Sequence, residues 1–191
     1  MHLFLDYDGP MHPDAVYVIK GKITLKADGI ALFEHAPVLE ELLEPHPHVK
    51  IVLSTSWVRI LGFDRAKHYL PAELQRRVVG ATFHREMNRD HPGRFASITR
   101  FEQINQYVRR HNLERWIALD NDAVGWPDEL RRHLVHVDDW AGLSDPDAQK
   151  QLSERLKVDS RLHAEPRAKD GMVNDGGTSE IKSAKDGRDA F

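Results

Sequence analysis

The chain of 191 residues contains no cysteine, which excludes disulfides, thiolate metal sites and cysteine nucleophiles. Oxygen and imidazole groups are therefore the ligands that it offers to a metal ion. The sequence also lacks any run near the roughly 20 apolar residues of a membrane span, so we expect no membrane partner. Because it shows no charged leader followed by an apolar segment, we expect a cytoplasmic protein.

The chain has only a small net charge. The chain carries 27 Lys and Arg residues against 30 Asp and Glu residues, and a formal net charge of -3 gives no general attraction to nucleic acid. Binding to nucleic acid would therefore need a local patch. Residues 83–100 are locally basic and are the candidate for one, although a solvated loop of mixed charge is the simpler interpretation.

Large apolar residues are scarce beyond about Val158. A segment of this composition cannot bury enough surface to offset the entropy lost on ordering. The length suits a single domain, since domains commonly have roughly 100 to 200 residues. We therefore expect one folded domain over residues 1–157 and a disordered polar tail over residues 158–191.

Short apolar runs alternate with amphipathic segments within residues 1–157. This alternation is typical of a parallel sheet with helices on both faces, so the expected fold class is α/β, doubly wound. Strands are expected at residues 3–6, 49–53, 78–81, 116–120 and 134–137. Helices are expected at residues 37–44, 71–77, 99–111 and 144–156, the last with Ser144 as its N-cap, and a hairpin is expected at residues 16–25.

Two acidic residues, Asp6 and Asp8, stand at the end of the first expected strand. The alternation of side chains along a strand predicts that both point the same way, with Tyr7 opposed. Gly9 and Pro10 then break the strand, which places the pair at the carboxyl end of the sheet, where open α/β sheets bind ligands. Two neighbouring carboxylates repel each other, whereas a hard divalent cation such as Mg2+ would accept both. An ordinary polar turn is the alternative.

Polar residues follow two further expected strands. Ser54, Thr55 and Ser56 follow residues 51–53. A bound phosphate could accept hydrogen bonds from their hydroxyls and from free backbone N–H groups. Residues 120–122, with the sequence Asp-Asn-Asp, return acidic groups to the same edge of the sheet. Each cluster alone could be a helix cap or a turn, but three of them in this order favour one shared site.

The segments LDYDG (residues 5–9), LSTSW (53–57) and ALDND (118–122) together resemble the haloacid dehalogenase (HAD) superfamily. In particular they are similar to the small HAD domain of Swiss-army-knife RNA repair proteins, and the resemblance spans roughly residues 1–156. It implies a Rossmann-like, mainly parallel sheet and a Mg2+-dependent phosphatase. Asp6 would be the nucleophile that forms an aspartyl-phosphate. Asp8 would protonate the leaving oxygen and later activate water, and an acid at this position favours phosphoryl transfer over carbon–halogen cleavage.

The resemblance also implies how phosphate would be held. Thr55 would bind the transferring phosphoryl oxygens, with Ser56 or Ser54 as the alternative if the register differs by one residue. A basic residue must neutralise the phosphate and the nucleophile. Its candidates, in order of preference, are Arg100, Arg94 and Arg77.

The implied metal site uses Mg2+ and carboxylate ligands. Asp6, Asp8 and Asp120 would form it, with either Asp122 or Asn121 beside them. The sequence departs from the superfamily pattern here, because Asn121 stands where many relatives have a second acid. The choice between Asp122 and Asn121 therefore stays open.

The spacing of the motifs leaves no room for a large cap domain. The core elements expected above fill the 47 positions from Asp8 to Thr55 (55 - 8) and the 65 from Thr55 to Asp120 (120 - 55). The site should be open apart from a minimal flap, the hairpin at residues 16–25. In this superfamily an open site goes with larger substrates, which favours a nucleotide or the terminal phosphate of an RNA or DNA end.

Trp57, beside the expected site, could stack on a base, with a place in the core as the alternative. The competing functions are a small-molecule phosphomonoesterase and a non-catalytic HAD-like binding module. Nothing in the sequence predicts the oligomeric state.

Overall fold

The computed structural model describes residues 1–19, 22–84 and 93–164, except for the side chains of residues 94, 96 and 159–164. A five-stranded sheet in the order β5-β4-β1-β6-β7 forms its centre, and all four of its strand pairings are parallel. The strands are β1 (His2–Leu5), β4 (Lys50–Leu53), β5 (Val78–Ala81), β6 (Trp116–Asp120) and β7 (Leu134–His136). The predicted α/β class and its parallel sheet are confirmed.

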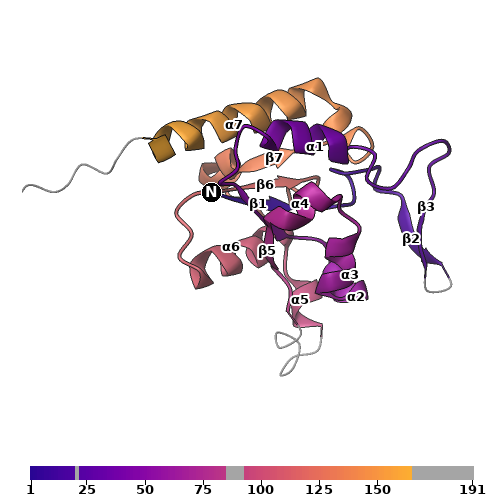
Figure 1. Cartoon of the computed structure of the whole chain (residues 1–191). Coiled ribbons are helices and arrows are strands. Elements are labelled where there is room, and N and C mark those ends of the chain that lie inside the picture. The colour runs from indigo at the N-terminus through magenta and orange to yellow at the C-terminus, as the bar shows by residue number, and fades with distance from the viewer. Residues whose placement is uncertain (20–21, 85–92, 165–191) are drawn as a thin grey trace, which may run out of the picture.

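Helices cover both faces of this sheet, as expected for a doubly wound fold. Figure 1 shows α1 and α7 along one face and α6 on the other. The helices are α1 (Ala36–Leu43), α2 (Ser56–Leu61), α3 (Phe63–His68), α4 (Ala72–Arg77), α5 (Arg94–Ser97), α6 (Arg100–Arg110) and α7 (Pro146–Ala164), with the 3-10 turns η2 (Asp128–His133) and η3 (Gly142–Ser144). The short helices α2 and α3 were not predicted, because six residues each are too few to show a helical period.

The side chains of each strand divide between two cores. Leu3 and Leu5 join the core that also holds the buried residues of α1, α4 and α7. Phe4, between them, joins the second core with Ile104 and Tyr107 of α6. Its ring meets that of Tyr107 edge to face, at 5.5 Å between centroids. Because residues two apart along a strand share a face, Asp6 lies on the same side of the sheet as Phe4, which is the α6 side.

Helix α7 differs from its prediction at both ends. It begins at Pro146, and the Asp145 side chain accepts a hydrogen bond from the Asp147 N–H at 2.9 Å, so Asp145 is the cap instead of Ser144. The helix continues to Ala164, eight residues beyond the predicted end at Leu156. Residues 158–164 mix good and weak helix formers but contain neither Pro nor Gly, so nothing in them breaks the helix after its apolar periodicity has stopped. Residues 158–164 are thus helical, and the rest of the predicted tail, 165–191, lies outside the described residues.

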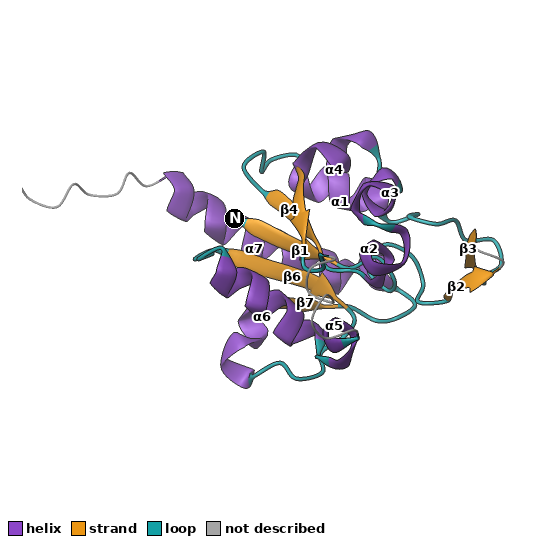
Figure 2. Ribbon diagram, turned by 90° about the horizontal axis from the view of Figure 1, so that it is seen from below, coloured by secondary structure: helices purple, strands orange, loops and turns teal. Residues whose placement is uncertain are grey.

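The predicted hairpin is present as β2 (Val16–Ile19) and β3 (Lys22–Leu25), which pair only with each other. It projects from the end of the domain in two perpendicular views (Figures 1 and 2). No larger insertion interrupts the described segments between the motifs, in agreement with a minimal flap and no large cap. Among the helices that the structure describes, none is both long and apolar enough to cross a membrane.

Candidate active site

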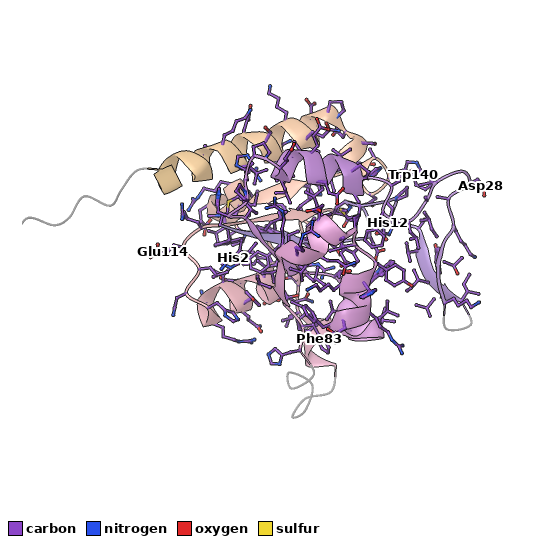
Figure 3. The ribbon with its side chains drawn as sticks, in the orientation of Figure 1. His2, His12, Asp28, Phe83, Glu114 and Trp140 are labelled. Atoms are coloured by element: carbon purple, nitrogen blue, oxygen red, sulfur yellow. The ribbon has the colours of Figure 1, made fainter. Side chains whose placement is uncertain are left out.

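Loops at the carboxyl ends of three neighbouring strands bring the expected site residues to one edge of the sheet. Asp6 follows β1, Thr55 follows β4, and Asp120 is the last residue of β6. Figure 3 shows His2, at the start of β1, and His12, shortly after this strand, at opposite ends of the sheet. The candidate site lies at the His12 end, which is the end from which the hairpin projects.

Arg100 joins two buried carboxylates in this site. Its Nη2 atom donates to Asp6 Oδ2 at 2.8 Å, and its Nε atom lies 3.3 Å from Asp120 Oδ2. The second contact is an ion pair without hydrogen-bond geometry, because neither atom has a hydrogen-bond partner. Thr99 places Arg100 at the start of α6 through a reciprocal capping box with Glu102.

The other two candidate cations differ from Arg100. Arg77 donates hydrogen bonds to the main-chain carbonyls of Leu43, His46 and Val49, and thereby ties α4 to the end of α1. The side chain of Arg94 lies outside the described residues. Of the two arginines that can be compared, only Arg100 contacts Asp6.

The charges of Arg100, Asp6 and Asp120, a trio of buried groups, favour the binding of a further cation. Burial is the main reason that the pKa of Asp6 is raised to about 6. The charge of Arg100 lowers this pKa, and the negative charge of Asp8 raises it. Burial and the charge of Asp6 also raise the pKa of Asp120 well above its usual value. Burial lowers the pKa of Arg100, but its two carboxylate partners outweigh this and raise it. One guanidinium therefore faces two buried carboxylates, which leaves the site with excess negative charge.

Thr55 connects this trio to helix α2. It is the N-cap residue, and its Oγ1 accepts the N–H of Trp57 at 3.4 Å. The Thr55 side chain also hydrogen-bonds to Asp6 and favours the ionised carboxylate. Ser54 is fully buried and its hydroxyl has no hydrogen-bond partner in the described part of the chain, whereas Ser56 is partly exposed as the first residue of α2. Thr55 is therefore the hydroxyl of this cluster that is in contact with Asp6.

Asp8 and Asp6 have different side-chain partners, although the charge of Asp8 acts on Asp6 and raises its pKa. Strand β1 ends at Leu5, and the chain turns through Gly9 with φ +87°, so Asp8 lies in the loop after the strand. The Asp8 carboxylate instead accepts hydrogen bonds from Trp57 Nε1, at 3.1 and 3.0 Å to its two oxygens, and lies 3.2 Å from His12 Nε2.

Trp57 is therefore not available as a stacking platform. Its side chain is 1% exposed and packs among aromatic rings, so the expectation that it stacks on a base is wrong. His12 is fully buried beside it. No spacing rule in the sequence indicates that His12 contacts Asp8.

The loop after β6 separates the two alternatives there. The Asn121 amide donates to Asp139 Oδ1 at 2.8 Å and to Asp14 Oδ2 at 3.3 Å, away from Asp6. The Asp122 carboxylate accepts the N–H of Val124 at 2.8 Å, and its charge helps to raise the pKa of Arg100. Asp122 is thus electrostatically coupled to the site, whereas Asn121 braces the surrounding loops.

A family model described as the HAD domain in Swiss Army Knife RNA repair proteins matches residues 2–148. The chain belongs to this family. The assignment supports a phosphohydrolase and agrees with the HAD resemblance of the three motifs. No curated protein and no solved structure matches the chain.

The site of this HAD domain offers carboxylate oxygens to which a divalent cation could bind. Within residues 1–19, 22–84 and 93–164, no three His, Asp or Glu side chains converge as a metal-binding group. However, Asp120 Oδ2 is buried without a hydrogen-bond partner, and Asp6 and Asp120 exceed the single charge of Arg100. Oxygen donors with excess negative charge are what Mg2+ binds, so the residues present fit this ion.

A groove of about 990 Å³ lies in this HAD domain between α2, α3 and β5, and the described residues that line it do not include Asp6, Thr55 or Arg100. It begins at Val58, one residue after Trp57, and its floor includes Phe63 and Phe83. Two exposed arginines, Arg59 and Arg65, line it, and neither has an ion pair with any side chain in the described part of the chain. The exposed carboxylate of Asp64 also lines it, so the two arginines leave the described lining with a small excess of positive charge beside aromatic rings.

Proposed function

We propose that this HAD domain is a Mg2+-dependent phosphatase that removes the terminal phosphate of a nucleotide or nucleic acid end. The observation that carries the proposal is the environment of Asp6. This carboxylate lies at the carboxyl edge of the sheet, hydrogen-bonded to Arg100 at 2.8 Å and to Thr55. A nucleophile beside a fixed cation and a hydroxyl donor has the partners that a transferring phosphoryl group requires.

The chemistry proceeds in two steps. An Asp6 oxygen attacks phosphorus, the bond to the leaving oxygen breaks, and Asp8 gives its proton to that oxygen. Asp8 then takes a proton from water as the water attacks phosphorus, and the bond from phosphorus to the Asp6 oxygen breaks, which releases phosphate and restores the Asp6 carboxylate and the protonated Asp8. Arg100 neutralises the phosphoryl oxygens and Thr55 donates a hydrogen bond to them. Mg2+ bound by Asp6 and Asp120, with Asp8 or Asp122, would offset the repulsion between carboxylate and phosphate.

The groove between α2, α3 and β5 supports a substrate that extends beyond its phosphate. Arg59 and Arg65 would attract a phosphodiester backbone, and the partly exposed ring of Phe63 offers a surface against which a base could stack. A small phosphomonoester would leave this groove empty. The absence of a large insertion in the described segments also leaves the approach to Asp6 open for a polymer end.

The test is phosphate release from p-nitrophenyl phosphate, 5'-nucleotides, and RNA or DNA oligomers with 3'- or 5'-phosphate ends, with and without Mg2+. Asp6→Asn should abolish release. Asp128→Asn, which removes a fully exposed carboxylate paired only with Arg131, is the matched control and should have wild-type activity. A preference for small esters would favour the small-molecule phosphomonoesterase. No release by folded protein that binds oligomers would favour a non-catalytic binding module.

A further inference from the structure

The Asp8 carboxylate is held from two separate segments of the chain. Trp57 Nε1, on α2, lies 3.1 Å from Oδ1 and 3.0 Å from Oδ2, so one N–H bridges both oxygens. His12 Nε2, on the loop after β1, lies 3.2 Å from Oδ1. The Asp8 side chain is 21% exposed, so part of it still reaches solvent and a substrate.

The hydrogen-bonding state of His12 follows from its other ring nitrogen. The main-chain N–H of Phe33 donates to His12 Nδ1 at 3.3 Å. Nδ1 is therefore an acceptor without a proton, and the proton of the neutral ring resides on Nε2, from which it is donated to Asp8. Both contacts to the carboxylate are thus made by neutral donors.

The two donors cannot easily turn away from Asp8. His12 is fully buried and Trp57 is 1% exposed. The indole lies edge to face against Tyr7 at 5.4 Å, Phe33 at 5.5 Å and Tyr69 at 4.9 Å between ring centroids. Rings packed in this way have no room to change rotamer, so the positions of both N–H groups are set by the core.

Burial alone does not demand this contact. Trp126 is also buried, at 4% exposure, yet its Nε1 has no hydrogen-bond partner within the described part of the chain. The indole N–H of Trp57 is instead directed at a carboxylate that stands two residues from the proposed nucleophile. This difference between two buried tryptophans indicates that the Trp57 contact serves Asp8 as well as packing.

We infer that Trp57 and His12 are positioning residues that orient Asp8 for proton transfer to the leaving oxygen. The inference rests on the proposed phosphatase function. As the bond from phosphorus to the leaving oxygen breaks, its electron pair stays on that oxygen and the Asp8 proton moves to it. Fixing the carboxylate keeps its free lone pair and proton in line with this atom, which an unrestrained side chain would reach only part of the time.

The leaving group distinguishes this role from a structural one. An alkoxide is a poor leaving group and needs the proton, whereas p-nitrophenolate departs as a stable anion without it. Loss of orientation should therefore reduce kcat/KM for an alkyl phosphate and leave kcat/KM for p-nitrophenyl phosphate nearly unchanged. The ratio kcat/KM reports the steps up to release of the leaving group and excludes the later attack of water, in which Asp8 is the base. A general loss of folding would lower both values together.

The experiment compares Trp57→Phe with the matched control Trp126→Phe in the full chain with Mg2+, using β-glycerophosphate and p-nitrophenyl phosphate. Trp57→Phe should lower kcat/KM about tenfold for the alkyl ester and no more than about twofold for the aryl ester. Trp126→Phe should change neither. Equal losses for both esters in Trp57→Phe, or no loss for either, would overturn the inference.

A pair of His12 variants gives the same answer if Trp57→Phe fails to fold. His12→Gln supplies an amide N–H toward Asp8 and an oxygen toward Phe33, and should keep alkyl ester hydrolysis within about threefold of wild type. His12→Leu should show the selective loss. Equal behaviour of these two variants on the alkyl ester would contradict the inference. A wild-type protein that hydrolyses neither ester would instead contradict the proposed function on which it depends.

A readout without metal or substrate tests the contact directly. The four tryptophans give four indole N–H signals in a 1H–15N spectrum, and the Trp57 signal is the one absent from Trp57→Phe. Asp8→Asn should shift this signal and leave that of Trp126 in place. An unchanged Trp57 signal would show that its N–H does not bond to Asp8, which would also overturn the inference.

Discussion

The Nη2 atom of Arg100 donates a hydrogen bond to Asp6 Oδ2 at 2.8 Å, although the two residues are 94 positions apart in the sequence. The same guanidinium lies within 3.3 Å of Asp120. A single cation thus balances two buried carboxylates that end adjacent strands. Both the stability of this edge of the sheet and its proposed chemistry depend on that balance.

Arg100→Gln should weaken both. It leaves Asp6 and Asp120 buried without their cation, which we expect to cost about 3 kcal/mol of unfolding free energy at pH 7 and to lower kcat about a hundredfold. Urea unfolding and phosphate release measure the two effects. Arg131→Gln, which breaks only an exposed pair with Asp128, is the control and should change neither. A stability equal to wild type would contradict the ion-pair network.

Stability without metal should fall as the pH rises from about 4 to 6. The pKa of Asp6 is raised to about 6 by burial, above its ordinary value of 3.8, so in this interval the folded chain binds more protons than the unfolded chain. More protons bound in the folded state means that unfolding free energy decreases with pH. Asp6→Asn should remove on the order of 2 kcal/mol of this decrease. Urea titrations with EDTA at several pH values would test it, and parallel curves for the two proteins would contradict the expectation.

Mg2+ should stabilise the folded chain because it binds the excess carboxylate charge only when the strands have brought it together. We expect millimolar Mg2+ to raise Tm by about 3 °C in the wild type and by much less in Asp120→Asn, as measured by thermal unfolding. Comparing Asp122→Asn with Asn121→Ala tests which of the two residues takes part in the metal site. Loss of the Mg2+ effect in Asp122→Asn alone would assign this role to Asp122. An equal Mg2+ effect in wild type and Asp120→Asn would argue against this metal site.

Charge reversal in the groove should separate substrate binding from chemistry. Arg59→Glu combined with Arg65→Glu should lower kcat/KM for phosphorylated oligonucleotides about tenfold and reduce its salt dependence, since both arginines line the groove beside α2. Hydrolysis of p-nitrophenyl phosphate should be unaffected. Lys157→Glu, on the exposed side of α7, makes the same charge change per residue as the control. If oligonucleotides were processed equally well by the groove variant, the groove would have no part in their binding.

Several features of the site were predictable from local sequence. The apolar runs predicted β1, β4 and β6, and parallel strands necessarily bring their carboxyl ends to one edge, so the proximity of Asp6, Thr55 and Asp120 followed. The start of α6 was predictable too, because Thr99 and Glu102 have the spacing of a capping box. That signal places Arg100 at a helix start, but does not say what the helix start faces.

The direction of side chains beyond a strand end was not predictable. Alternation predicted that Asp6 and Asp8 point the same way, but β1 ends at Leu5 and the following loop turns through a left-handed glycine, so alternation alone does not decide the direction of Asp8. The resemblance placed Arg100 first among the candidate cations, whereas its contact with Asp6 depends on which helix packs against the face that Asp6 shares with Phe4. Neither fact is local, since each is decided by loop conformation and by helix packing.

The sequence by itself determined the fold class, the order of the polar motifs and the edge of the sheet at which they meet, because strand period and parallel connection are properties of short segments. Only the tertiary structure decided that Trp57 is buried and bonded to Asp8, across 49 positions of sequence, and that His12 shares the same carboxylate. A hydrogen bond between distant segments requires both backbones to be placed within a fraction of an ångström, and it is the packing of the whole core that places them.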